Sequence, residues 1–296
     1  MNGLLSSLAS QPLVCDGAMG TQLLAQGLES GECGMLWNVE RPDVVRGVHE
    51  AYRQAGCRLI TTNTFGGSSS ALGRHNLEAR MAELNRAGAQ NARKAAGDTA
   101  WVLGDVGPFG DFLEPLGDMT AEELSEIFRL QMAALAEGGA DAILIETMSD
   151  PAEAEVALSA ARDFAGLPAI ATFAFQKTRD GKFRTMMGTE AAEAVSRAVA
   201  AGADIVGANC GTELSLADYV DLARELVRAA GKNPVIVQPN AGSPQLVDGQ
   251  TVYRATPDEM AAMVPELLKA GVRIIGGCCG TSPAHLAAMA KRCSCS

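Results

Sequence analysis

The chain has 296 residues, 47% of them hydrophobic and 20% charged, which is enough for one large barrel or two ordinary domains. Acidic residues outnumber basic residues by 35 to 24, and the net charge of −11 disfavours nucleic acid and anionic membrane surfaces as partners. No apolar run reaches the ~18 residues of a membrane span, and no secretory signal opens the chain, so we expect a cytoplasmic protein.

One pattern recurs eight times along the chain. A short apolar run ends in Gly, Asn, Asp, Thr or Cys, and an amphipathic helical stretch follows it. The apolar runs, interpreted as strands, are residues 13–15, 59–63, 102–105, 142–146, 169–173, 205–209, 235–239 and 274–277. Such short and uniformly apolar runs are typical of strands buried on both faces.

Helix-start signals separate these strands. Thr120 and Glu123 form a capping box that opens a helix to residue 137, and two glycines follow it. Asp, Thr or Ser stands before Pro at 150–151, 256–257 and 282–283, which is a common way for a helix to begin.

Eight strand–helix units predict a (β/α)8 TIM-type barrel, an α/β fold in which residues 1–296 form a single domain. The alternative is a doubly wound open sheet. It is disfavoured because the glycines that follow the first strand, at 17 and 20, lack the spacing of a dinucleotide-binding loop. Residues 291–296 are predicted to be a mobile tail.

Three cysteines stand at predicted strand ends, where the active sites of such barrels lie. Cys210 follows the sixth strand, and Cys278 and Cys279 follow the eighth. Three thiolates with one open coordination position are typical of a catalytic zinc site. An adjacent cysteine pair needs a sharp turn, which we expect the glycines at 276, 277 and 280 to allow. A redox pair is disfavoured, because there is no C-x-x-C motif and a disulfide between neighbours is strained.

Zinc held by three thiolates carries a net negative charge. A thiol that enters the fourth position loses its proton yet keeps an electron-rich sulfur, which favours attack on a methyl group over hydrolysis of water.

Two carboxylates at strand ends supply the second half of the predicted site. Asp16 and Glu146 have no basic neighbour in sequence and could hold an ammonium group. The backbone at Gly17 and Ala18 could meet a carboxylate at a helix start, and Asn63 is a further candidate contact. Two alternatives stay open: Asp16 could be a helix cap, and Glu146 could form an ion pair.

Several segments together resemble the homocysteine S-methyltransferase family, and most closely the homocysteine-binding module of cobalamin-dependent methionine synthases. They are DGAMGT at 16–21, TTNTF at 61–65, GDVGP at 104–108, ET at 146–147, NC at 209–210, PNAG at 239–242 and GGCCGT at 276–281. The resemblance covers about residues 13–291.

This resemblance implies a zinc-bound homocysteine that accepts a methyl group and becomes methionine. Cys210, Cys278 and Cys279 would be the zinc ligands, and Asn240 would be a possible fourth ligand before the substrate arrives. Asp16 and Glu146 would hold the L-homocysteine ammonium. The methyl group would come from methylcobalamin on a corrinoid partner protein or cobalamin module, which a methyltetrahydrofolate module would serve.

Two other functions stay open at this point. Single-barrel relatives use a small onium donor such as betaine or S-methylmethionine, and a quaternary ammonium favours an aromatic cage. Only Trp37, Phe65, Phe173 and Phe175 are expected near the barrel mouth, so a donor carried by a partner is favoured. A non-catalytic thiol- or metal-binding subunit would not need an open zinc position. The chain gives no role to Cys293 or Cys295.

Overall fold

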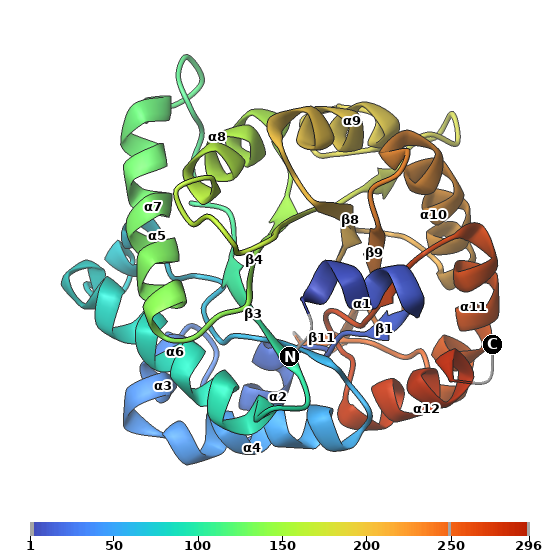
Figure 1. Ribbon diagram of the computed structural model, residues 1–296, viewed down its shortest axis with the longest axis horizontal. Helices are drawn as coiled ribbons and strands as arrows, with labels where there is room; N and C mark the ends of the chain where they lie inside the picture. The colour runs from blue at the N-terminus through green and yellow to red at the C-terminus, as the bar shows by residue number, and fades with distance from the viewer. Residues whose placement is uncertain (1–2, 248–249, 295–296) are drawn as a thin grey trace.

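A computed structural model describes residues 3–247 and 250–294, and these residues form a barrel of parallel strands inside a ring of helices (Figure 1). In this part of the chain the barrel has eight strands. They are β1 (Leu13–Val14), β2 (Leu59–Thr61), β3 (Trp101–Val106), β4 (Ala142–Met148), β5 (Ala169–Phe173), β8 (Ile205–Asn209), β9 (Val235–Gln238) and β12 (Ile274–Ile275). They pair in the order β1-β12-β9-β8-β5-β4-β3-β2. A parallel bridge between Cys15 and Leu59 links the two ends of that order, so the predicted barrel fold is confirmed.

Helices follow the strands and form the outer layer (Figure 1). The long ones are α4 (Pro42–Gln54), α6 (Met81–Ala96), α7 (Ala121–Glu137), α8 (Pro151–Ala161), α9 (Ala191–Ala201), α10 (Leu216–Ala230), α11 (Pro257–Ala270) and α12 (Pro283–Cys293). The predicted capping box of α7 is present, because Thr120 accepts a hydrogen bond from Glu123 N–H and Glu123 accepts one from Thr120 N–H. Asp150 caps α8 by accepting from Ala152 N–H. Shorter helices α2 (Met19–Ala25), α3 (Trp37–Glu40) and α5 (Ser69–Gly73) lie in the loops.

Helix α1 (Leu4–Ser10) and two hairpins are among the elements that were not predicted from the sequence. Helix α1 lies across one end of the barrel, and its Leu4 and Leu8 join the apolar side chains of the barrel interior (Figure 1). Two hairpins extend from loops, β6 (Gln176–Lys177) with β7 (Phe183–Arg184) and β10 (Gln245–Val247) with β11 (Gln250–Val252). Their strands are two or three residues long, too short for a periodic pattern to reveal them.

Strand ends also differ from the prediction. β2 stops at Thr61 instead of residue 63, because the chain turns there and Thr64 N–H donates to Thr62 O. β9 stops at Gln238, since Pro239 has no N–H for the sheet. These early endings free the polar residues that follow each strand to face the open end of the barrel.

The last helix overlaps the predicted mobile tail. α12 continues to Cys293, whose side chain is half-buried against the main apolar core. The mobility of residues 291–296 therefore stays a prediction, and Cys295 lies outside the described residues. None of the helices within the described ranges is long and apolar enough to cross a bilayer.

Glu153 in the first turn of α8 predicts a pH-dependent stability. Its side chain is 5% exposed and accepts a hydrogen bond from Phe109 N–H, and burial raises its pKa from the usual 4.5 to about 7. Ionising it above pH 7 therefore costs the folded state about 3 kcal/mol, and this cost disappears below pH ~4.5, where the side chain is protonated in both states. Glu153→Gln keeps the acceptor for Phe109 and removes the ionisation.

The unfolding free energy of Glu153→Gln should exceed that of the wild type at pH 8 and approach it at pH 5. Urea unfolding at both pH values measures the difference. A difference that is the same at pH 5 and pH 8 would show that Glu153 does not titrate in this range.

Candidate metal and substrate site

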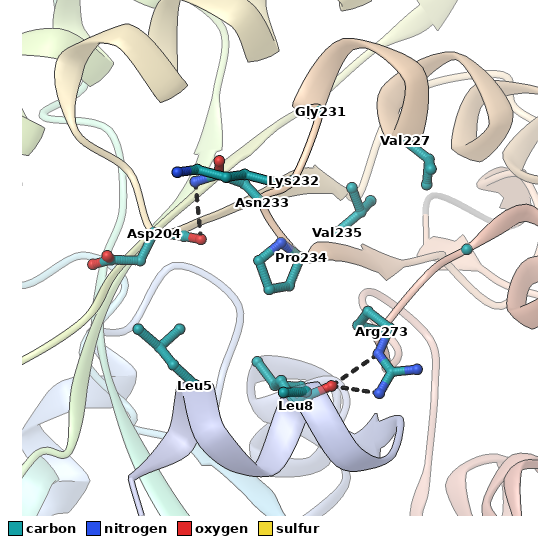
Figure 2. A pocket seen from close by; sticks show the side chains of 12 residues that line it. Leu5, Leu8, Asp204, Val227, Gly231, Lys232, Asn233, Pro234, Val235 and Arg273 are labelled. Carbon is teal, nitrogen blue, oxygen red and sulfur yellow. Dashed lines mark hydrogen bonds between the residues drawn. The ribbon is translucent and has the colours of Figure 1, made fainter.

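A cavity of about 740 Å³ opens at the carboxyl ends of the barrel strands. It brings together residues from strand ends and loops that are far apart in sequence, including Gly17, Ala18, Thr61, Asn63, Phe65, Asp105, Glu146, Cys210, Gln238, Cys278 and Cys279. A cavity of about 490 Å³ lies at the other end of the barrel, beside α1 (Figure 2). There Arg273 donates to the carbonyl oxygen of Leu8, so that end holds α1 in place and presents none of the predicted site residues.

The three predicted cysteines meet at the wall of the large cavity. The sulfur of Cys279 lies 4.0 Å from that of Cys210 and 4.0 Å from that of Cys278, and all three lie within 4.8 Å of one another. In a tetrahedral site with sulfur ~2.3 Å from zinc, two sulfurs are roughly 3.8 Å apart. The three sulfurs are therefore spaced to fit one zinc ion.

The backbone around the cysteines is bent to bring them together. Cys210 has a φ of 54°, a left-handed value that residues other than glycine rarely adopt, and Gly211 follows with 95°. In the other loop Gly280 has a φ of 78°, and a Cβ there would lie 2.3 Å from the Tyr253 side chain. The expectation that Gly276 and Gly277 adopt left-handed backbone angles is wrong. Glycine is required at these positions because a Cβ would collide with Cys15 at 276 and with Thr281 at 277.

Hydrogen bonds already shift the acidity of the thiols. Hydrogen bonds with Cys210 and Cys278 lower the pKa of Cys279 to about 3, and hydrogen bonds with Cys210 and Cys279 raise the pKa of Cys278. One member of the cluster is thus prepared to be a thiolate, which is the form that binds metal.

Asn240 ties the two cysteine loops to each other. Its Oδ1 accepts from Cys279 N–H at 3.0 Å, and its Nδ2 donates to Gly211 O at 3.0 Å. Its side chain is 3% exposed, so it braces both loops from the buried side. A carbonyl oxygen has a second lone pair, and the predicted contact of Asn240 with a metal stays a prediction.

Glu146 faces the cavity and is oriented by Asn209. Asn209 Nδ2 donates to Glu146 Oε2 at 3.2 Å, and the Asn209 oxygen accepts from Thr147 N–H and Thr172 Oγ1. Burial raises the pKa of Glu146 to about 7. Glu146 forms no salt bridge with any residue in the described ranges, which removes the alternative of an ion pair.

Asp16 lies behind the cavity wall. Its two oxygens accept from Thr61 N–H at 2.8 Å and Thr61 Oγ1 at 2.7 Å, and it does not cap α2. Thr61 lines the cavity, whereas Asp16 does not. Burial, opposed by the bonds from Thr61, raises the pKa of Asp16 to about 7. The Asp16 carboxyl group therefore lies close to the cavity without lining it.

Other predicted contacts are partly engaged within the protein. Ala18 N–H donates to Thr281 Oγ1 at 3.0 Å, beside Gly17. Asn63 Nδ2 donates to Gly34 O and to Asn38 Oδ1. Ala18 and Asn63 line the cavity, and their contacts with a substrate stay predictions.

The expected aromatic residues are mostly elsewhere. Phe65 lines the cavity and is 46% exposed, whereas Phe173 and Phe175 are buried against each other with ring centroids 6.0 Å apart. Trp37 is buried and stacks on Arg41. The sequence also missed Tyr253, whose side chain helps to lower the pKa of Cys279. The short β10–β11 hairpin leads to it, and no pattern marks that hairpin.

Asp105 belongs to the GDVGP segment at 104–108, and the sequence predicted no role for it. It stands on β3, is 3% exposed, and lines the cavity beside Glu146. Burial and the nearby charge of Glu146 hold its pKa well above the usual range. A carboxylate inside a strand end is hard to assign from sequence, because the alternation of a two-sided buried strand does not say which side faces the barrel interior.

Comparisons with known proteins agree with this geometry. The model of the family "homocysteine S-methyltransferase" matches residues 13–293. Methionine synthase of Mycobacterium tuberculosis is 35% identical over 303 residues and that of Mycobacterium leprae 33% over 314. These alignments cover 96% and 98% of this chain, which spans about a quarter of the length of these curated relatives. The crystal structure of the homocysteine methyltransferase MmuM from Escherichia coli, metallated form, has a TM-score of 0.79 and 28% identity, and covers 98% of this chain and 100% of that one.

Proposed function

Since the chain belongs to the homocysteine S-methyltransferase family, we propose that it binds L-homocysteine, activates its thiol at a zinc ion, and transfers a methyl group to the sulfur to form methionine. One observation carries this proposal: three cysteine sulfurs spaced for one zinc stand in the same cavity as Glu146 and other carboxyl groups. One small amino acid can place its thiol at the three sulfurs and its ammonium at the carboxyl groups.

Cys210, Cys278 and Cys279 would hold the zinc, and the solved relative described as metallated supports a metal in this fold. When bound, zinc lowers the pKa of a thiol in its fourth position, so that the sulfur reacts as a thiolate. The three cysteines leave that position open, and Asn240 is the proposed ligand there before substrate binds. A cytoplasmic location stays a prediction that would keep the thiols reduced.

Glu146 would accept hydrogen bonds from the substrate ammonium, and Asp16 would add negative charge through the wall formed by Thr61. Backbone groups at Gly17 and Ala18 would meet the substrate carboxylate, with Asn63 beside them. Fixing both ends of the amino acid points its thiol at the cysteine cluster and excludes water from that part of the cavity.

We propose methylcobalamin on a partner protein or module as the methyl donor, with a methyltetrahydrofolate module to recharge it. Two observations support this choice over an onium donor. The curated relatives are methionine synthases, and of the four aromatic residues expected at the mouth only Phe65 lines the cavity. A cage for betaine or S-methylmethionine needs more aromatic faces.

The zinc-loaded protein should convert L-homocysteine to methionine when free methylcobalamin is supplied, and mass spectrometry of methionine measures this. Parallel reactions with betaine and with S-methylmethionine identify the donor. Methionine from either onium donor alone would reject the cobalamin proposal and keep the transferase. Thiol binding without methionine from any donor would favour the non-catalytic subunit.

Glu146→Gln should weaken L-homocysteine binding roughly 10- to 100-fold at pH 8, because it removes the charged acceptor of the ammonium group. Calorimetric titration of the zinc-loaded protein measures the dissociation constant. The zinc content should stay that of the wild type, since Glu146 is not a proposed ligand. Unchanged affinity would show that the ammonium binds elsewhere.

A further inference from the structure

One carboxyl oxygen of Asp105 receives no hydrogen bond from any described residue, although the side chain interacts with Glu146. Asp105 is 3% exposed and lines the large cavity. The unpartnered oxygen is Oδ1, which has no hydrogen-bond partner among the described residues. A buried carboxyl oxygen without a donor is unfavourable, so such a group in a binding cavity indicates a missing ligand atom.

The backbone holds Asp105 firmly in place. Its N–H donates to Thr62 Oγ1 at 2.9 Å, and its carbonyl oxygen accepts from Thr64 Oγ1 at 2.7 Å and from Gln131 Nε2 at 3.4 Å. These three residues fix the end of β3, and the position of Asp105 does not depend on a ligand.

The surroundings of Asp105 suit a cation as the partner of its free oxygen. The groups that set the pKa of Asp105 are burial, Glu146 and Asp16, all of which disfavour its charge, and in the described chain no salt bridge reaches any of the three carboxyl groups. The Gln238 Oε1 atom is a second buried acceptor on this cavity that has no partner within residues 3–247 and 250–294. An ammonium has three N–H donors and one positive charge, which suits such a set of acceptors.

We propose that Asp105 is a direct contact of the substrate ammonium beside Glu146, and that it makes the cavity select amino-acid thiols over thiols without an amino group. This inference rests on the proposed function. Asp16 is bonded to Thr61 behind the wall, whereas Asp105 and Glu146 line the cavity and lie within hydrogen-bonding reach of each other. Both carboxyl groups can therefore accept hydrogen bonds from one ammonium group.

The test compares two thiols on zinc-loaded protein by calorimetric titration at pH 8. L-Homocysteine carries the amino group, and 4-mercaptobutanoate is the same molecule without it. Asp105→Asn should weaken L-homocysteine binding roughly 10- to 100-fold and change 4-mercaptobutanoate binding less than about twofold. The control Glu32→Gln removes a negative charge from the exposed rim of the same cavity and should change neither.

Equal weakening of both thiols by Asp105→Asn, or no weakening of either, would overturn the role of Asp105 while leaving the proposed function intact. Wild-type protein that binds neither thiol would overturn both. Zinc content and thermal unfolding check that Asp105→Asn is folded, and Asp105→Ser gives the same comparison if it is not.

Discussion

Replacing Cys210, Cys278 or Cys279 with alanine, one at a time, is expected to abolish both zinc retention and methyl transfer. The sulfurs lie about as far apart as three ligands of one tetrahedral zinc, so each substitution removes a third of the protein ligands. Two remaining thiolates bind zinc far more weakly and also lose the negative charge that keeps the substrate sulfur reactive. Zinc per chain after dialysis, measured by mass spectrometry, and the rate of methionine formation test this.

Cys33→Ala is the matched control. Cys33 is a free cysteine that lines the same cavity but does not belong to the cluster of three sulfurs. This variant should keep one zinc per chain and wild-type turnover. A Cys278→Ala protein that kept one zinc per chain and full activity would contradict the proposal that three thiolates hold the zinc.

Gly207→Ala should prevent stable folding. Gly207 lies within β8, directly paired with Ile236 of β9, and a Cβ there would lie 1.8 Å from the Ile236 carbonyl oxygen. Both strands are buried, so neither can move without opening the sheet, and a loss above about 4 kcal/mol is expected. The same shift would displace Cys210, three residues further along the chain. Soluble yield and the melting temperature measure the effect.

Gly47→Ala is the control for added volume at a glycine. Gly47 lies on the exposed side of α4, and nothing stands within 4 Å of a Cβ at this position. Alanine there should stabilise the helix by about 1 kcal/mol. A Gly207→Ala protein that melted at the wild-type temperature would contradict the close approach of β8 and β9 at this position.

Much of the fold could be predicted from the sequence, because strands buried on both faces leave a strong apolar signal. Residues 169–173 and 205–209 follow directly from that pattern, and their bounds agree with β5 and β8. Helix α1 could not be found this way, since its seven residues bury only Leu4 and Leu8 and carry no side-chain cap.

The site divides in the same manner. Adjacent cysteines among glycines are rare enough to predict the meeting of Cys210, Cys278 and Cys279. The sequence could not say which carboxylates face the cavity, because that depends on side-chain direction at the strand ends. Asp16 and Asp105 both follow apolar residues, yet only Asp105 lines the cavity. The sequence did not predict a role for Tyr253, because the hairpin that precedes it has no periodic pattern.

The most direct test is X-ray absorption at the zinc edge, recorded with and without L-homocysteine. We expect one zinc per chain with three sulfur ligands and one nitrogen or oxygen ligand, changing to four sulfur ligands when L-homocysteine is added. No bound zinc, or a sulfur count that L-homocysteine does not change, would contradict thiol activation at Cys210, Cys278 and Cys279.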